Sequence, residues 1–169
     1  DYGCSRACHA IGMHNDLGGR GLWTCVDIDE TSILQAESLC ADRAQNPKGF
    51  AFFISDNSKF LPNNTYDAAI LMEILEHVPD PISLLEDIER TIKPNGWIII
   101  TVPSGPVEYA MWVEQPQRMR EHVREFTHDD LGDIFGQKDN LTIHWANFGK
   151  SRYIDMDLGC YFLAYQKTG

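Results

Sequence analysis

Residues 72–81, with the sequence MEILEHVPDP, place two carboxylates and one imidazole close together in the chain: Glu73, Glu76 and His77. They lie at the end of a largely apolar segment, residues 67–74, which predicts a buried strand. On a helical turn this spacing puts all three side chains on one face. Two interpretations follow: a metal or substrate site, or the solvent-exposed start of a helix.

A further imidazole, His122, is expected to join this group. It follows the next predicted strand, residues 96–103, so its loop opens at the edge of the sheet where open α/β proteins bind ligands. Carboxylates and neutral imidazoles crowded together repel or desolvate one another unless a cation, either a proton or a metal ion, lies among them. We therefore expect the four side chains to converge, with His77, His122 and Glu76 as candidate catalytic residues and His122 as a general base if no metal is bound.

A second group of candidate binding residues opens the chain. In the sequence DYGCSRA, Asp1, Gly3, Ser5 and Ala7 occupy alternate positions. Small residues in a turn between a strand and a helix let a ligand approach backbone N–H groups near the helix N-terminus. The turn lacks the G-x-G-x-x-G pattern of dinucleotide-binding proteins, which argues against a nicotinamide-dependent enzyme.

Acidic residues follow the next two predicted strands. Asp27 ends the strand at 21–28, where a carboxylate can accept both hydroxyls of a ribose; alternatively Asp27 or Asp29 caps the next helix. Asp56 ends the strand at 49–55 and can accept the amine of an adenine, or it only forms a turn.

The elements that must position these residues alternate between strand and helix. This order predicts an α/β, Rossmann-like, doubly wound and mostly parallel sheet in a single domain, residues 1–169. The predicted helices are 30–45, 80–96 and 127–136, and Asp80 and Thr127 are the expected N-caps of the last two. The helix at 80–96 has an expected buried stripe of Ile82, Leu85, Ile88 and Ile92. The last two predicted strands, 140–149 and 159–167, can pair antiparallel. A sheet of this kind needs a central strand before Asp1, so we expect an apolar strand upstream of the sequence.

Composition limits the function classes. Hydrophobic content of 43% suits one globular domain, and no apolar run is long enough for a membrane span. The formal net charge of −11 disfavours broad nucleic-acid binding, although a local patch could form around Arg118, Arg120 and Arg124. Five scattered cysteines without a C-x-x-C pair predict reduced thiols and a cytoplasmic location.

The order of these motifs resembles the class I S-adenosylmethionine-dependent methyltransferases over nearly the whole chain. That family's first loop has the pattern D/E-x-G-x-G-x-G, in which Ser5 and Ala7 here replace the second and third glycines. The resemblance implies a sheet whose last strand runs antiparallel. It also implies S-adenosylmethionine as cofactor, with these cofactor-binding residues: Asp1, Gly3, Ser5, Asp27, Ile28, Asp56, Asn57 and Met72.

Two groups within the family share the E-x-x-E-H segment. The ubiquinone-pathway O-methyltransferases carry a segment similar to MEILEHVPDP. The small-RNA terminal 2′-O-methyltransferases hold a divalent metal with residues that match Glu73, Glu76, His77 and His122. This implies a magnesium or manganese ion that polarises the reacting hydroxyl. Metal-free methyltransferases share the LEHV sequence as well, and there the acid caps a helix.

The expected activity is methyl transfer from S-adenosylmethionine to a hydroxyl of a small molecule or glycan. Residues 104–121, which mix aromatic, methionine and arginine side chains, are the expected substrate lid or, alternatively, a packed connecting helix. Because two glycines of the cofactor loop are replaced, a non-catalytic cofactor-binding or scaffold domain is an alternative function, and an RNA 2′-O-methyltransferase is another. The oligomeric state does not follow from the sequence.

Overall fold

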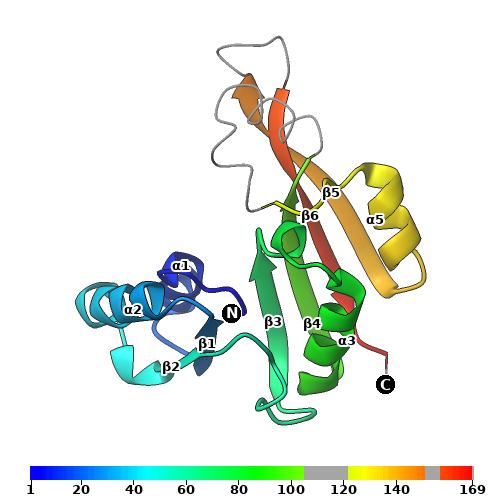
Figure 1. Cartoon of the computed structure of the whole chain (residues 1–169). Helices are drawn as coiled ribbons and strands as arrows, with labels where there is room; N and C mark the ends of the chain where they lie inside the picture. Colours follow the sequence, from blue (N-terminus) through cyan, green and yellow to red (C-terminus); the bar gives the residue numbers. More distant parts are fainter. Residues whose placement is uncertain (105–121, 151–156, 169) are drawn as a thin grey trace. The chain divides into compact units, whose positions relative to one another are not determined.

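The structure is a computed structural model that describes residues 1–104, 122–150 and 157–168. The chain divides into two compact units, Asp1–Phe60 and Leu61–Gly169, called unit 1 and unit 2 below. Each unit contains strands and helices of its own, shown along the sequence from blue to red in Figure 1.

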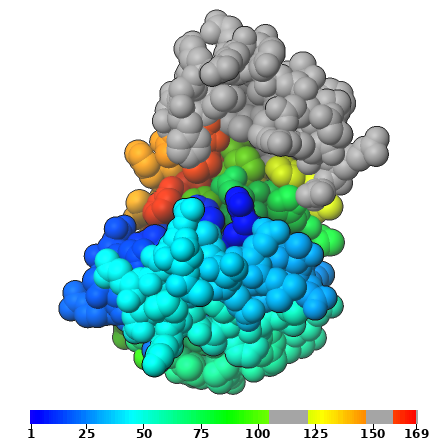
Figure 2. Space-filling view, turned by 90° about the vertical axis from the view of Figure 1, so that its left-hand side faces the viewer, coloured from blue at the N-terminus to red at the C-terminus, as the bar shows by residue number. Residues whose placement is uncertain are grey.

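Unit 1 is built around two parallel strands, β1 (Trp23–Asp27) and β2 (Phe50–Ile54). The helices of this unit are α1 (Cys8–Asp16) and α2 (Glu30–Arg43), and a short 3₁₀ turn, η1 (Pro47–Gly49), leads into β2. Helix α2 contacts both strands. The surface of this unit is coloured blue to cyan in Figure 2. Its core consists of small and medium side chains: Cys4, Ala7, Ala10, Ile11, Cys25, Ile33, Ala36 and Cys40.

Unit 2 contains a sheet with the strand order β3-β4-β6-β5. Strands β3 (Tyr66–Met72) and β4 (Ile92–Pro103) are parallel, so their carboxyl ends meet at one edge. Strand β6 (Asp157–Gln166) is antiparallel to β4, and β5 (Asp139–Lys150) is antiparallel to β6. The predicted α/β fold with an antiparallel last strand is therefore confirmed.

Two helices cover the same face of this sheet, α3 (Pro81–Thr91) and α5 (His128–Phe135). Both contact the fully buried Tyr165 of β6. The Tyr165 hydroxyl donates to the Glu89 carboxylate of α3 at 2.7 Å, and the Phe135 ring of α5 lies 5.7 Å from the tyrosine ring. Burial and the Glu89 carboxylate raise the pKa of Tyr165, so the phenol stays protonated as the donor.

The predicted end of α3 is wrong. The helix ends at Thr91 rather than at residues 94–96, because Ile92 already pairs with Tyr66 as the first residue of β4. Gly96 is required where the backbones approach: a Cβ there would lie 2.8 Å from the Asp67 carbonyl oxygen. The predicted buried stripe holds for Leu85, Ile88 and Ile92, whereas Ile82 is exposed.

Within the described residues, no helix has the length and apolar character that crossing a membrane requires.

Candidate active site

A 3₁₀ turn, η2 (Leu75–His77), follows β3 and carries two of the predicted residues, Glu76 and His77. Its apolar residue, Leu75, is fully buried and anchors the turn, which contacts β4. Glu73 lies before the turn and not on it. Its backbone is left-handed, with φ of 54°, and its N–H donates to the Thr101 carbonyl oxygen of β4 at 3.0 Å. The expected helical turn therefore carries only Glu76 and His77 of the three residues.

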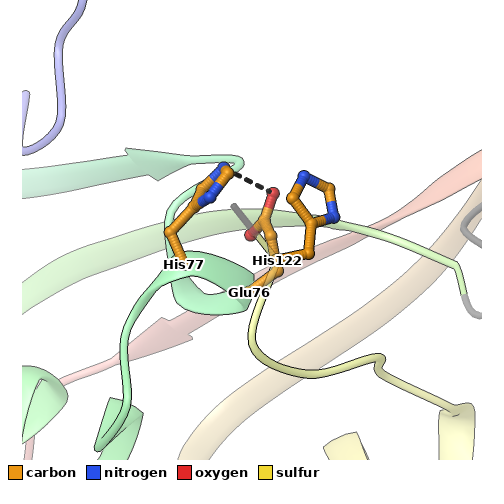
Figure 3. A group of neighbouring side chains, drawn as sticks. All are labelled: Glu76, His77 and His122. Atoms are coloured by element: carbon orange, nitrogen blue, oxygen red, sulfur yellow. Dashed lines mark ion pairs between the residues drawn. The ribbon is translucent and has the colours of Figure 1, made fainter. Parts of the chain in front are cut away.

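His122 lies beside this turn, although it is 45 residues beyond His77 in the chain. The next residue, Val123, donates its N–H to the Glu76 carbonyl oxygen at 2.8 Å. The ligand atoms of Glu76, His77 and His122 all lie within 4.8 Å of one another. Figure 3 shows the Glu76 carboxylate between the two imidazole rings. We call these three residues the Glu-His-His cluster; Glu73 is not part of it.

The cluster has a buried side and an accessible side. The Glu76 side chain is 1% exposed, whereas that of His77 is 36% exposed. The two rings meet edge to face with centroids 4.6 Å apart, and His77 Nε2 lies 3.8 Å from Glu76 Oε1. A nearly buried carboxylate next to two imidazoles can attract a proton or a divalent cation. The cluster can therefore act as a proton acceptor or as a three-ligand metal site.

Glu73 has different neighbours. Burial raises the pKa of the Cys160 thiol, and the negative charge of Glu73 adds to this effect. The Glu73 carboxylate therefore acts on Cys160 of β6, and it is not one of the three grouped ligands. The separation follows from the backbone, since a left-handed residue between the strand and the turn redirects the chain.

The opening turn in unit 1 holds the predicted cofactor residues in an unusual backbone conformation. Gly3 has φ of 70°, and Ser5 and Ala7 have φ of 46° and 54°. The Gly3 N–H donates to the Val26 carbonyl oxygen at 2.8 Å, which fixes the turn beside β1. Ser5 and Ala7 thus adopt the left-handed conformation that glycine favours. The turn therefore has left-handed residues at both positions where the family pattern has glycine.

Asp27, at the end of β1, is hydrogen-bonded to this turn. Its Oδ2 accepts from the Ser5 N–H at 2.7 Å, and its Oδ1 accepts from the Asp29 N–H at 2.9 Å. Asp29, not Asp27, caps α2 by accepting from Thr31 and Ser32. Asp27 was expected to bind ribose, but its contact with the turn was not expected, because a backbone N–H donor leaves no signature in the sequence.

The remaining predicted cofactor residues lie at the ends of strands. Ile28 follows β1 and is 70% exposed, and Asp1 is half-buried. Asp56 and Asn57 are exposed after β2, where the Asn57 amide donates to the Asp56 carboxylate at 2.7 Å. Met72 is the last residue of β3 in unit 2. Of the predicted lid, only Ser104 belongs to the described residues; 105–121, with Arg118 and Arg120, lie outside them.

The cysteines are not part of the Glu-His-His cluster. All five cysteines are free thiols, as predicted, and four of them are buried. Cys4 donates to Cys25, which raises the pKa of Cys4 and lowers that of Cys25.

Comparison with known proteins identifies the family. A model of the methyltransferase domain matches residues 2–144. This chain belongs to that methyltransferase family. Its fold is that of the class I S-adenosylmethionine-dependent enzymes: a methyltransferase from Methanosarcina mazei superimposes with a TM-score of 0.69 at 18% identity, covering 99% of this chain and 91% of that one.

Among curated proteins, the similarity is to ubiquinone biosynthesis O-methyltransferases. The one from Aeromonas salmonicida is 38% identical over 65 residues, which is 38% of this chain and 27% of that protein. The one from Colwellia psychrerythraea is 32% identical over 104 residues, which is 60% of this chain and 41% of that protein. This chain therefore spans less than half of the length of either relative.

Solved structures of this fold differ in activity. Phosphoethanolamine N-methyltransferase 2 of Haemonchus contortus, solved with S-adenosyl-L-methionine, has a TM-score of 0.75 at 14% identity and covers 100% of this chain and 48% of that one. The cyclase SpnF has a TM-score of 0.74 at 17% identity, covering 99% of this chain and 74% of that one. Function must therefore be argued from the site and not from the fold.

Proposed function

We propose that this methyltransferase transfers a methyl group from S-adenosylmethionine to a hydroxyl oxygen of a small molecule or glycan. The observation that supports it is the Glu-His-His cluster, whose ligand atoms lie within 4.8 Å of one another. A hydroxyl is a weak nucleophile until it loses its proton, so an O-methyltransferase needs a group that accepts this proton or stabilises the oxygen anion. The partial similarity to ubiquinone biosynthesis O-methyltransferases points in the same direction.

The residues of unit 1 suit the cofactor. Gly3, Ser5 and Ala7 have small side chains and left-handed backbones, so a ligand can approach the backbone at these three positions. Each of the two carboxylate oxygens of Asp27 accepts one N–H. A carboxylate has about four acceptor positions, so two positions are left to accept the hydroxyls of a ribose. We propose that Asp27 serves both purposes, and that Asp1, Ile28, Asp56 and Asn57 complete the cofactor-binding residues of this unit.

The reaction is an in-line displacement in which the acceptor oxygen forms a bond to the methyl carbon and the carbon–sulfur bond breaks. The cofactor supplies the electrophilic methyl group and leaves as S-adenosylhomocysteine. If no metal ion occupies the cluster, the acceptor's proton passes to one of its imidazoles, His77 or His122. The buried Glu76 carboxylate stabilises the resulting imidazolium, because opposite charges attract strongly where water is excluded. The protein's main contribution is alignment and proton transfer.

We further propose that the cluster holds a divalent metal. Two imidazoles and a carboxylate suit manganese and other transition-metal ions better than magnesium, which prefers oxygen ligands. Ligands of one ion at about 2.0–2.2 Å lie at most about 4.4 Å apart, so the cluster needs only a small adjustment to close on an ion. When bound, such an ion would lower the pKa of the acceptor hydroxyl.

Calorimetric titrations with S-adenosylhomocysteine and Mn²⁺ test both parts. S-adenosylhomocysteine should bind the wild type and bind Asp27→Asn at least tenfold more weakly, because the amide loses the charge-assisted acceptor. Mn²⁺ should bind the wild type and bind His77→Ala at least tenfold more weakly. His144→Ala, a change at an exposed histidine of β5, is the matched control and should bind Mn²⁺ like the wild type.

The two titrations fail separately. No binding of S-adenosylhomocysteine would favour a scaffold function and reject the enzyme. Binding of S-adenosylhomocysteine without any binding of Mn²⁺ would reject the metal and retain the cluster as the proton acceptor. In that case methylation of hydroxylated acceptors should be insensitive to EDTA; with a metal, EDTA should abolish it and Mn²⁺ should restore it.

A further inference from the structure

The segment that carries His122 has no helix or strand between residues 122 and 125. Contacts with the rest of unit 2 must therefore fix its imidazole beside Glu76 and His77. One contact is the hydrogen bond from the Val123 N–H to the Glu76 carbonyl oxygen at 2.8 Å. Another is the buried side chain of Phe126, whose backbone bridges to Ser104 at the end of β4.

Arg124 adds a side-chain contact on the other side of the 3₁₀ turn. Its Nη2 donates to the Pro79 carbonyl oxygen at 2.5 Å, two residues beyond His77. Its Nε is buried and has no hydrogen-bond partner within the described part of the chain. Hydrogen bonds hold the pKa of Asp80 below its usual value, chiefly through the Ser83 N–H, and the positive charge of Arg124 contributes. The guanidinium thus bonds to Pro79 and lies close enough to Asp80 to act on its carboxylate.

We propose that Arg124 is a positioning residue that holds His122 in the Glu-His-His cluster by fastening residues 122–126 to residues 76–80. Val123 and Arg124 contact the turn at Glu76 and Pro79, so they bracket His77. The Val123 bond and the Phe126 bridge both fix the backbone on the C-terminal side of His122. The Arg124 side chain adds a contact to Pro79, three residues beyond Glu76, and this restraint sets the direction of the nearby imidazole.

This inference rests on the proposed function only for its consequence, because the positioning itself concerns the free protein. Loss of an outer contact of a metal ligand typically lowers metal affinity by about 10–100-fold. Arg124→Met keeps most of the apolar stem and removes the donor, whereas Arg124→Lys keeps a charged donor on a stem of similar length. The contrast between these two variants isolates the hydrogen bond from side-chain packing.

The test uses the full chain labelled with ¹³C-histidine and two measurements. Nuclear Overhauser effects between the rings of His77 and His122 report their contact without any metal, and calorimetry reports Mn²⁺ affinity. In the wild type and Arg124→Lys the ring-to-ring effect should be present. In Arg124→Met it should be lost, with Mn²⁺ affinity at least tenfold weaker. Arg43→Met, at an exposed arginine of α2, is the control and should match the wild type in both measurements.

A ring-to-ring effect that persists in Arg124→Met, or is missing in the wild type, overturns the proposal. If the wild type does not bind Mn²⁺ but Arg124→Met still loses the ring contact, Arg124 is the positioning residue and the metal part of the proposed function is wrong. If Mn²⁺ binds the wild type and Arg124→Met equally and the contact persists, the metal site stands and the role of Arg124 is rejected.

Discussion

Ser5 of the opening turn makes a favourable hydrogen bond in an unfavourable backbone conformation. Its N–H donates to the Asp27 carboxylate at 2.7 Å, and its φ is 46°. The left-handed conformation costs an L-residue with a side chain roughly 1–2 kcal/mol. Ser5 is exposed, so no packing of its side chain offsets this cost. Ala7 has the same strain, but its methyl group is fully buried in the core of unit 1.

We expect Ser5→Gly to stabilise the protein. Glycine removes the left-handed strain of roughly 1–2 kcal/mol but restores about 0.5–1 kcal/mol of chain entropy to the unfolded state, which leaves a gain of about 0.5–1 kcal/mol. Urea denaturation of both proteins measures the difference. Ser38→Gly, at an exposed position inside α2, is the matched control and should destabilise, because the helix conformation does not need glycine. Loss of stability in Ser5→Gly would contradict the strain argument.

The residue types of the site could be predicted from the sequence, but the backbone that arranges them could not. Glu76, His77 and His122 were expected together, and the structure brings them together. Glu73 was expected with them because a regular helical turn was assumed. The left-handed φ of Glu73 is set by its backbone bond to Thr101, a residue of another strand. Such a tertiary contact has no local sequence pattern.

Helices α2, α3 and α5 each begin with a side chain that accepts a backbone N–H: Asp29, Asp80 and Thr127. Hydrogen bonds from Ser83 lower the pKa of Asp80, and those from Ser32 lower the pKa of Asp29. The predicted caps at Asp80 and Thr127 are confirmed, because the cap depends only on residues within one turn of it. The end of α3 was predicted less well, since pairing with β3 determines it.

The Asp80 cap makes the stability of unit 2 depend on pH. Because the folded-state pKa is lower than the unfolded value of about 3.9, the contribution is fully present above that value and is lost as pH falls through the folded pKa. Asparagine caps comparably and does not titrate. We therefore expect the stability of wild type relative to Asp80→Asn to be greatest at pH 7 and to decline below about pH 4.

Urea denaturation at pH 7 and at acidic pH checks this for both proteins. Asp133→Asn, at an exposed position within α5 and away from a helix start, provides the comparison. A constant difference between wild type and Asp80→Asn across the pH range would show that the cap is not ionic.

At the scale of the whole chain, charge distinguishes the candidate acceptors. The 169 residues contain 25 acidic and 14 basic side chains, for a net charge of −11. Proteins that bind RNA through its backbone neutralise phosphates with Lys and Arg, and their affinity falls steeply as salt rises. A chain with an excess of acidic residues repels the RNA backbone, and salt weakens this repulsion beyond the screening length. The charge therefore favours a small acceptor over RNA.

We accordingly expect no measurable binding of a short single-stranded RNA at about 10 μM protein and roughly physiological salt, since even non-specific binders reach dissociation constants of about 1–100 μM. Fluorescence anisotropy of a labelled RNA, measured with S-adenosylhomocysteine present, gives the affinity. Lower salt should not create binding, because it strengthens the repulsion of an acidic protein. Saturable binding below 1 μM that weakens with salt would mean that basic side chains gather locally despite the net charge. Such a result would mean that the methyl acceptor is a ribose hydroxyl of RNA and not a small molecule.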